Sequence, residues 1–494
     1  MSADLLAQLS PRLTRPSWTA PRVARTEVLA GLVVALALIP ESISFSIIAG
    51  VDPRVGLFAS FTMAVVIAFT GGRPAMISAA TGAVALVVAP LVSDHGLPYL
   101  LAAVVLGGVF QVLLGLVGFA RLMRFVPRSV MVGFVNALAI LIFSAQLPQL
   151  IGVPWLVYPM VAAGLVIIFG LPRVTTVVPA PLVAIVVLTV VTVTVGLTVP
   201  DVGGEGDLPD SLPFAALPDV PLTVETFQIV FPYALGVAFV GLMESLMTAK
   251  LVDDITDTHS DKTRESWGQG VANIVTGFTG GMGGCAMIGQ TMINVKSGAR
   301  TRLSTFLAGV FLLVLVVALG DVVSLIPMAA LVAVMVFVSI ATFDWHSLRT
   351  IHRMPRSETA VMLSTVAVVV WTGNLAIGVG VGVLVACVLF ARRIAHLVEV
   401  TSTDDGGTRV YQVRGALFFA SSNDLYTQFD YAGDPAEVVI DLSAAQVWDA
   451  STVAALDAIT HKYEIRGKRA TVVGLDGHSA DRYDRHAGRL GGEA

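Results

Sequence analysis

Long apolar runs recur between residues 27 and 397 of this 494-residue chain and decide which folds are open to it. Most of them approach the roughly 20 residues that a helix needs to cross a lipid bilayer. A hydrophobic content of 55% and a charged content of 13% leave too few polar residues to cover soluble domains of this length. We therefore expect a polytopic helical membrane protein. Its net charge of -5 gives no sign of a nucleic-acid partner.

The apolar runs form two sets of seven, separated by a Pro-, Gly- and Asp-rich connector at 200–225. The first set predicts helices at 27–49, 55–70, 76–92, 99–119, 129–150, 157–170 and 180–199. The second predicts helices at 226–252, 267–280, 286–295, 301–319, 324–341, 358–372 and 374–397. The runs that begin near Ala75 and Ala286 are short and partly polar, so we expect broken helices that start there.

The basic residues give this arrangement a direction, because cytoplasmic loops are rich in Lys and Arg. If the N-terminus is cytoplasmic, only Arg54 falls outside. The cytoplasmic set is then Arg12, Arg15, Arg22, Arg25, Arg73, Arg121, Arg124, Arg128, Arg173, Lys250, Lys262, Arg264, Lys296, Arg300, Arg302, Arg349, Arg353, Arg356, Arg392 and Arg393. An odd number of spans in each set makes the second an inverted copy of the first, as in many secondary transporters.

These observations predict five regions in a plasma (inner) membrane protein with both termini in the cytoplasm. They are an N-terminal cytoplasmic segment at 1–26, membrane repeat 1 at 27–199, an extracellular or periplasmic connector at 200–225, membrane repeat 2 at 226–399 and a soluble domain at 400–494. In the soluble domain, strand-like runs at 410–419, 438–442 and 470–475 alternate with helical patterns at 422–429 and 451–466. This last region therefore reads as a small cytoplasmic α/β domain.

Two similar passages, one in each repeat, place an acid inside apolar sequence. They are Glu41-Ser42 followed by Ala75-Met76-Ile77-Ser78, and Glu244-Ser245 followed by Ala286-Met287-Ile288-Gly289. A charged side chain at membrane depth costs at least about 2.5 kcal/mol on insertion scales, which marks both acids as candidates for function. The alternative is a carboxyl held by a structural hydrogen bond or a water pocket.

The candidate site follows from helical spacing around the two acids. Ser44 and Phe45 share the helix face of Glu41, and Thr248 shares that of Glu244. Two short helices that start near Ala75 and Ala286 would aim unpaired N–H groups at an anion between them. The predicted substrate-binding residues are Glu41, Phe45, Ser78, Ala286, Met287, Ile288, Gly289, Gln290 and Thr291, and the predicted ion-coupling residues are Glu41, Glu244 and Thr248.

No enzymatic constellation competes with this interpretation. The chain has no Walker loop, Ser-His-Asp grouping or zinc spacing, so we expect no enzyme activity, cofactor or bound metal. Its two cysteines, Cys285 and Cys387, lie in apolar runs, where a structural disulfide is not expected. An ion gradient is then the expected source of energy.

Three stretches resemble the SulP anion transporters, the sulfate-permease family that includes prestin. Its signature is similar to the run Asn294, Val295, Lys296, Ser297, Gly298, Ala299, Arg300, Thr301, Arg302, Leu303 and Ser304. Its first-span motif resembles Ile39-Pro40 with Ala49-Gly50. The soluble domain resembles a STAS domain through Val439-Ile440-Asp441-Leu442-Ser443 and Asp449-Ala450-Ser451-Thr452. The resemblance implies 14 spans as two intertwined inverted repeats, a core and a gate domain, an anion between the first, third, eighth and tenth spans, and a homodimer.

Two departures from the family pattern bear on mechanism. Glu41 stands where many similar members have Gln, and Gln290 stands where animal relatives often have Arg. A bound anion would meet a repelling carboxylate unless Glu41 is protonated, because like charge and desolvation both favour the neutral acid. We therefore expect proton-coupled symport by alternating access, with a small (di)carboxylate as the first substrate class.

Several other functions stay open from the sequence. Glu244 and Thr248 could hold Na⁺, which would make the protein a sodium-coupled bicarbonate or sulfate transporter. An anion exchanger, a channel and a membrane sensor that signals through the STAS domain are further alternatives. For a sensor Ser451 is of interest, since the corresponding serine in bacterial STAS antagonists is phosphorylated; it could equally serve a helix start next to Asp449.

Overall fold

The structure is a computed structural model and describes residues 21–121, 126–174, 179–213, 215–395 and 398–486. Most of the expected N-terminal segment at 1–26, with Arg12 and Arg15, lies outside these ranges, as does Arg124. The membrane part and the C-terminal α/β part separate into two compact units.

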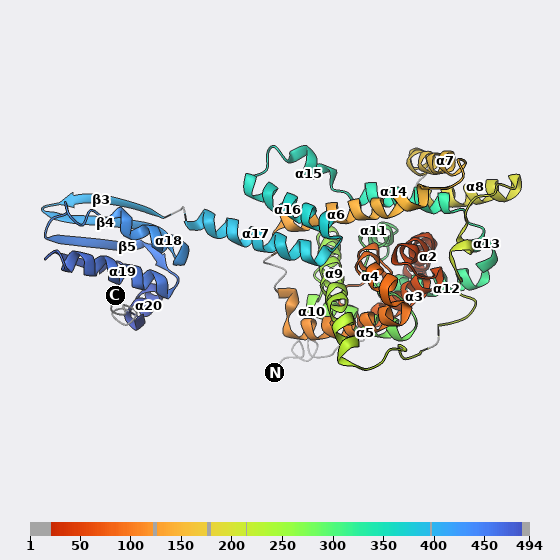
Figure 1. Cartoon of the computed structure of the whole chain (residues 1–494), viewed down its shortest axis with the longest axis horizontal. Helices are drawn as coiled ribbons and strands as arrows, with labels where there is room; N and C mark the ends of the chain where they lie inside the picture. Colours follow the sequence, from red (N-terminus) through yellow and green to blue (C-terminus); the bar gives the residue numbers. More distant parts are fainter. Residues whose placement is uncertain (1–20, 122–125, 175–178, 214, 396–397, 487–494) are drawn as a thin grey trace, which may run out of the picture. The chain divides into compact units, whose positions relative to one another are not determined.

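A helix overlaps each of the expected apolar runs (Figure 1). In the first half these are α2 (Pro21–Ala49), α3 (Pro53–Thr70), α4 (Gly82–His95), α5 (Leu97–Val117), α6 (Arg128–Gln146), α7 (Val157–Gly170) and α8 (Ala180–Val195). In the second half they are α9 (Val224–Thr256), α10 (Lys262–Phe278), α11 (Ile288–Lys296), α12 (Arg302–Ala318), α14 (Met328–Thr342), α16 (Arg356–Thr372) and α17 (Leu375–Ala395), with the short α13 (Gly320–Ser324) and α15 (Trp345–Thr350) between them.

Six helices of the described ranges are long and apolar enough to cross a membrane by length and composition alone. They are Pro21–Ala49, Pro53–Thr70, Leu97–Val117, Arg128–Leu150, Val224–Thr256 and Leu375–Ile394. Several of the others are shorter apolar helices. The total of 14 crossings therefore stays a prediction.

The two broken helices start later than the sequence suggests. The residues before them form two short strands, β1 (Ser78–Ala79) and β2 (Cys285–Ala286), which pair antiparallel across the repeats. This pairing gives hydrogen-bond partners to backbone N–H and C=O groups that lie outside the helices. Thr81 then caps α4 by accepting the N–H of Val84. The predicted start of the first broken helix is thus wrong, because α4 begins only at Gly82, whereas α11 begins at Ile288, two residues after Ala286.

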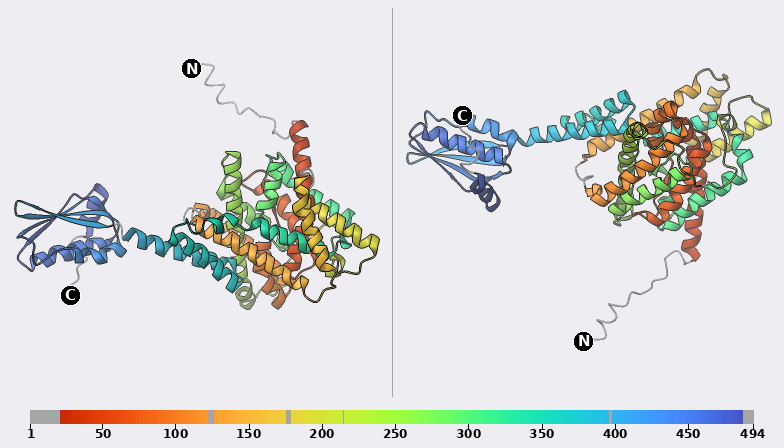
Figure 2. Two further views of the ribbon diagram at one scale, coloured as in Figure 1. Left: turned by 90° about the horizontal axis from the view of Figure 1, so that it is seen from above. Right: turned by 60° about the horizontal axis from the view of Figure 1, so that its bottom comes forward.

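Helices from the two halves of the chain mix to form two groups, as the interleaved colours of Figures 1 and 2 show. In the core group, α2, α3, α4 and α5 pack with α9, α10, α11 and α12. In the gate group, α6, α7 and α8 pack with α14, and α6 also packs with α16. The groups meet mainly where α2 contacts α14 and α4 contacts α6.

Close backbone approach fixes the two strands of the core group. A Cβ atom on Gly284 would lie only 1.9 Å from the carbonyl oxygen of Ala79, and one on Gly281 would lie 2.8 Å from the backbone of Ala59. Gly280 and Gly283 have φ values of 78° and 76°, which side chains rarely allow. This glycine run therefore serves tight packing as well as an unwound backbone.

A buried acid joins α2 to the segment before α12. The carboxylate of Glu27, 1% exposed, accepts hydrogen bonds from the backbone N–H groups of Arg300 (2.7 Å), Thr301 (3.0 Å) and Ser304 (3.2 Å). In the same stretch, Asn294 donates to the Ala75 carbonyl at 2.9 Å. These contacts give the run from Asn294 to Ser304 a structural role, because they join this part of the second repeat to the first repeat.

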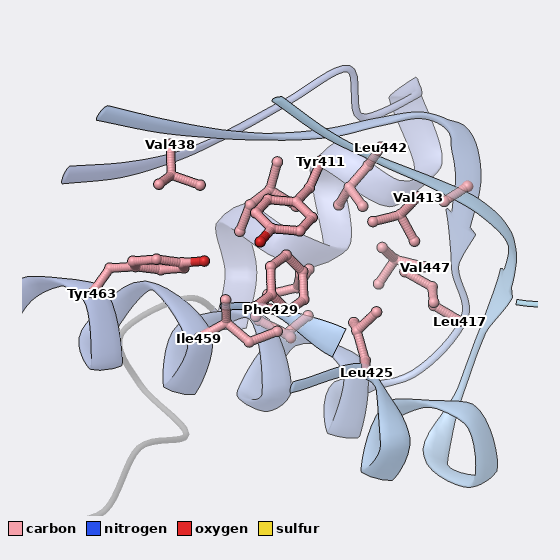
Figure 3. Close-up of a cluster of buried hydrophobic side chains, with 14 residues drawn as sticks. Tyr411, Val413, Leu417, Leu425, Phe429, Val438, Leu442, Val447, Ile459 and Tyr463 are labelled. Atoms are coloured by element: carbon pink, nitrogen blue, oxygen red, sulfur yellow. The ribbon is translucent and has the colours of Figure 1, made fainter. Parts of the chain in front are cut away.

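The C-terminal unit is a four-stranded sheet covered by helices. Its strands are β3 (Glu399–Asp405), β4 (Thr408–Leu417), β5 (Glu437–Val447) and β6 (Arg469–Val473), and its helices are α18 (Phe419–Leu425), α19 (Ala450–Glu464) and α20 (Gly477–His486). The order is β3-β4-β5-β6, antiparallel between β3 and β4 and parallel elsewhere. Figure 3 shows the buried core, where Phe429 and Ile459 face Val413 and Leu442 of the sheet.

One buried acid of this unit is bonded to two tyrosines and paired with an arginine. Tyr411 and Tyr463 donate their hydroxyls to the same oxygen of Asp434 at 2.8 and 2.5 Å, and Arg409 lies 3.3 Å from its other oxygen. Burial and the adjacent carboxylate raise the pKa of the Tyr463 hydroxyl above its ordinary value. Burial also raises the pKa of Tyr431 to about 12.

Candidate functional site

A cavity of about 880 Å³ lies between the core group and the gate group. Its core wall comes from α2, from the starts of α4 and α11, and from α9. Its gate wall comes from α6, α7, α8 and α14 and is largely apolar, with Phe134, Ile142 and Phe337 among its residues. Glu41, Glu244 and Lys296 are the charged groups in the described lining, and Lys296 lies with Ser297 at the C-terminal end of α11.

Glu41 of the first repeat and Gln290 of the second meet on this wall. The side-chain amide of Gln290 donates a hydrogen bond to Oε2 of Glu41, and both residues are buried yet line the cavity. The amide satisfies one carboxyl oxygen, as a polar group at this depth requires. Gln290 belongs to the first turn of α11, so the acid lies beside the positive end of that helix.

The starts of α4 and α11 both reach the cavity. Thr81, Gly82 and Gly289 line it, and nothing lies within 4 Å of a Cβ built on Gly289. The open space beside Gly289 lets a ligand approach the backbone N–H groups of the first turn of α11. Phe45 lines the same space and lies against Gly82, where a Cβ would be 2.9 Å from its ring. Phe45 therefore packs over the start of α4.

The second acid is held through a thiol. Sγ of Cys285 donates to Oε2 of Glu244 at 3.0 Å, and the same sulfur lies 3.2 Å from Oγ1 of Thr81. Thr248 donates its hydroxyl to the carbonyl oxygen of Glu244 at 2.8 Å and lies 3.3 Å from that of Ala286. Thr248 is fully buried and does not line the cavity, so it fixes α9 against β2 in this structure.

The structure divides the predicted substrate-binding residues into two sets. The set that lines the cavity is Glu41, Phe45, Met287, Ile288, Gly289 and Gln290. Ser78, Ala286 and Thr291 lie behind the wall and are fully buried. The hydroxyl of Ser78 accepts from Gln269 at 2.6 Å, and that of Thr291 accepts from the N–H of Ile77 at 3.0 Å. These three residues therefore fix the strand pair instead of facing the cavity.

Thr81, Cys285 and Lys296 belong to the site, and sequence reasoning did not assign them to it. Thr81 sits directly before an apolar run, which is the usual signal of a helix cap and could have located the start of α4. Cys285 gives no such signal, because its partners Glu244 and Thr81 are distant in the chain. Within the described ranges no cluster of three His, Cys, Asp or Glu residues could hold a metal ion.

A second, smaller cavity of about 290 Å³ lies farther along the same helices. It is lined by Ser44 and Ile48 of α2, Gln146 of α6, and Met328 and Leu331 of α14. Ser44 thus faces this space, although helical spacing suggested that it would join Glu41. Its hydroxyl donates to the carbonyl of Pro40 at 2.8 Å.

Known proteins match both parts of the chain. The sequence model of the "Sulfate permease family" matches residues 25–163 and 155–365, and that of the "STAS domain" matches residues 399–486. "Putative sulfate transporter YbaR" of Bacillus subtilis is 58% identical over 452 residues, 92% of this chain and 95% of that protein. "Bicarbonate transporter BicA" of a Picosynechococcus species is 25% identical over 517 residues, 94% of this chain and 91% of that protein.

Solved structures show the same fold. Murine Slc26a9, described as an anion transporter in the inward-facing state, superposes with a TM-score of 0.78 at 16% identity, over 98% of this chain and 91% of that one. The transmembrane domain of a cyanobacterial BicA superposes with a TM-score of 0.65 at 24% identity, over 74% of this chain and 98% of that one. The chain therefore has the fold of a multi-pass membrane protein followed by a STAS domain.

Proposed function

Because the chain belongs to the sulfate permease family, we propose that it is a secondary transporter that moves a small inorganic oxyanion together with a proton. The observation that carries the proposal is the hydrogen bond from Gln290 to Glu41 on the wall of a cavity reached by the starts of α4 and α11. Two helix starts offer N–H groups to an anion, while the nearest charged group is an acid.

The substrate class follows from the relatives, whose names specify sulfate or bicarbonate. The sequence ranked a small dicarboxylate first, but the comparisons support its alternative of sulfate or bicarbonate. A cavity of about 880 Å³ has room for either class. Sulfate and bicarbonate are therefore our first candidates, and dicarboxylates belong in the same test panel.

Proton coupling follows from the charge of Glu41. If the carboxylate is ionised, it occupies the positive end of α11 itself and repels an incoming anion. Two like charges about 5 Å apart at an effective dielectric constant of about 20 repel by about 3 kcal/mol, or about 100-fold in affinity. Protonation removes this repulsion and releases the helix start to the substrate. Anion and proton would then bind together.

The conformation fits a state open to the cytoplasm. The cavity extends to Pro172, Thr342 and the C-terminal end of α11, near loops that their basic residues predict to be cytoplasmic. Alternating access would then move the core group against the gate group, since the strand pair joins the two repeats within the core. Cytoplasmic termini, a plasma membrane location and a homodimer remain predictions.

The test is uptake into proteoliposomes of labelled sulfate and bicarbonate, with dicarboxylates as competitors. An inward proton gradient should accelerate uptake of the preferred anion. Glu41→Gln, which keeps the size and removes the proton, should bind anion without a need for protons and lose gradient-driven accumulation. Glu225→Gln, at an exposed acid in the first turn of α9, is the matched control. Uptake by wild type that ignores the pH gradient would refute proton coupling.

Sodium coupling is the second candidate, because Glu244 lines the cavity close to Thr248 and the carbonyl of Ala286. It predicts uptake that requires Na⁺ and survives Glu41→Gln. Exchange would instead require a counter-anion inside the vesicle, and a channel would never accumulate anion. A sensor should lose all activity on deletion of residues 400–494, whereas a transporter should keep some flux.

A further inference from the structure

A buried thiol joins two polar residues of the cavity wall, one from each repeat. Cys285 lies 3.0 Å from Oε2 of Glu244 and 3.2 Å from Oγ1 of Thr81. Glu244 and Thr81 both line the cavity, whereas Cys285 is fully buried behind them. The hydrogen-bond chain therefore runs from α9 of the second repeat, through β2, to the residue that caps α4 of the first.

We propose that Cys285 is a positioning residue that couples the protonation of Glu244 to the hydrogen bonding of Thr81 at the anion site. The inference rests on the proposed function as an anion transporter. It assigns Glu244 a role in anion binding, which the sequence left undecided. It also gives the buried cysteine a role in binding.

The coupling follows from the hydrogens available to the three groups. When Glu244 is a carboxylate, it accepts the single hydrogen of the thiol. The sulfur can then serve Thr81 only as an acceptor, so the Thr81 hydroxyl points at the sulfur and away from the cavity. An anion in the cavity gains no donor from Thr81 in this state.

Protonation of Glu244 reverses the direction of the chain. The new hydrogen on Oε2 is donated to the sulfur, and the thiol hydrogen turns to Oγ1 of Thr81. This oxygen still accepts the N–H of Val84, with N···O 3.4 Å, so both of its lone pairs are used and its own hydrogen is free to point into the cavity. No covalent bond other than that of the added proton changes. One donor is gained beside the anion.

The surroundings hold the sulfur in place for this exchange. Ala286, the neighbour of Cys285, receives the side chain of Thr248 at its carbonyl (3.3 Å) and donates its N–H to Ser245 (3.1 Å). Cys285 itself is paired with Ala79 in the strand pair. The strand is thus tied to α9 on one side and to β1 on the other, so a reversal of hydrogens costs less than a displacement of the sulfur.

Other titratable groups on the elements packed against α9 are not bonded to Glu244 in the described part of the chain. They are Lys296 on α11, Asp94 and His95 on α4, Tyr99 on α5, and Lys262, Arg264 and Glu265 on α10. Glu265 instead accepts the N–H groups of Gly72 and Arg73 at 2.7 and 3.0 Å. On the same wall of the cavity, Glu41 is bonded to Gln290. Cys285 is the titratable group in contact with Glu244.

The test is the pH dependence of anion binding by the full-length protein in lipid nanodiscs. The affinity for labelled sulfate is measured between about pH 5 and pH 8. In a second series the affinity for bicarbonate is measured only at the upper end of this range, because acid converts bicarbonate to CO2. A donor to a charged group is worth about tenfold or more in affinity, and this gain should appear as the pH falls. Cys285→Ser keeps one hydrogen and two lone pairs and should retain the gain. Cys285→Ala should abolish this gain, because the Thr81 hydroxyl then has no sulfur to bind and its hydrogen is free at every pH. The remaining cysteine, Cys387, is exposed on α17, and Cys387→Ala is the matched control.

An infrared measurement tests the chain without any anion. In the Cys387→Ala protein, the S–H stretch reports Cys285 alone. It should shift as the pH changes, because the thiol passes from a carboxylate acceptor to a hydroxyl acceptor, and Glu244→Gln should abolish the shift. This readout also serves if Cys285→Ala does not fold.

The outcomes separate this inference from the function on which it rests. If the affinity of Cys285→Ala rises with falling pH by the same factor as that of wild type, or if the S–H stretch does not respond to pH, the coupling is refuted and anion transport stands. If wild type binds neither anion at any pH while the S–H stretch shifts as expected, the hydrogen-bond chain stands, but the proposed function and the coupling to an anion both fall.

Discussion

Glu27→Gln tests whether a buried carboxylate joins α2 to α12. The two carboxyl oxygens accept three backbone N–H groups, two at Oε1 and one at Oε2, and the side chain is 1% exposed. A glutamine is nearly the same size, so the substitution changes charge and hydrogen bonding without opening a cavity. One of its two ends must now present an amide NH2 to a backbone donor.

The cost can be worked from these contacts. In the better orientation, the amide oxygen keeps the N–H groups of Arg300 and Thr301, and each bond loses about 1 kcal/mol with the charge. The N–H of Ser304 is left without an acceptor, at about 1 to 3 kcal/mol. Loss of the negative charge beside the start of α12 adds about 0.3 to 1 kcal/mol. The total is a destabilisation of about 3 to 6 kcal/mol.

The assay is thermal unfolding of the purified protein in detergent, followed by size-exclusion chromatography after heating. Glu27→Gln should lower the unfolding midpoint by several degrees relative to wild type. Glu225→Gln, at an exposed acid that also lies in the first turn of a helix, should leave the midpoint nearly unchanged. Equal midpoints for the two variants would refute the account of Glu27.

Three further predictions concern packing, pH and the cap of α19. Gly284→Ala should prevent folding, because its Cβ would lie 1.9 Å from a carbonyl oxygen of β1, whereas Gly289→Ala should fold and be recovered in normal yield, since nothing lies within 4 Å. The STAS domain should lose stability above about pH 10, because folding raises the pKa of Tyr431 from its ordinary value to about 12. Between these two values the unfolded chain ionises this hydroxyl and the folded domain does not, so rising pH favours unfolding. Circular dichroism at rising pH checks this. Asp449→Ala should lower the unfolding midpoint by the equivalent of about 1 to 2 kcal/mol through loss of a helix cap. Ser451→Asp, at an exposed position beside it, should leave that midpoint unchanged and alter transport only if phosphorylation regulates it.

The helices and the surroundings of both acids could be predicted from the sequence, because lipid constrains each of them. An apolar run of sufficient length has to become a helix in lipid, and a carboxyl within such a run has to find polar surroundings. Glu41 and Glu244 accordingly line the cavity between the two helix groups. The register of Phe45 with Glu41 followed from helical spacing, although Ser44 faces the second cavity.

What the sequence could not supply was set by distant partners. Small apolar residues around Ala75 and Ala286 suit a helix or a strand, and only the pairing of β1 with β2 decides between them. The same pairing turned Ser78 away from the cavity and brought Cys285 to Glu244. In the STAS domain, β3 was not predicted, because its run from Glu399 to Asp405 is polar on both faces, as an edge strand can be.

The pairing of β1 with β2 also bears on how the protein is made. The ribosome completes β1 long before it reaches β2, so the first repeat enters the membrane with a strand that has no partner and with α4 not yet packed against α9. In lipid such backbone groups are costly to leave unpaired. We therefore expect α4 to reach its final position only after the second repeat has been inserted. A chain truncated before residue 285 should be degraded by quality-control proteases and should not accumulate as a stable first repeat.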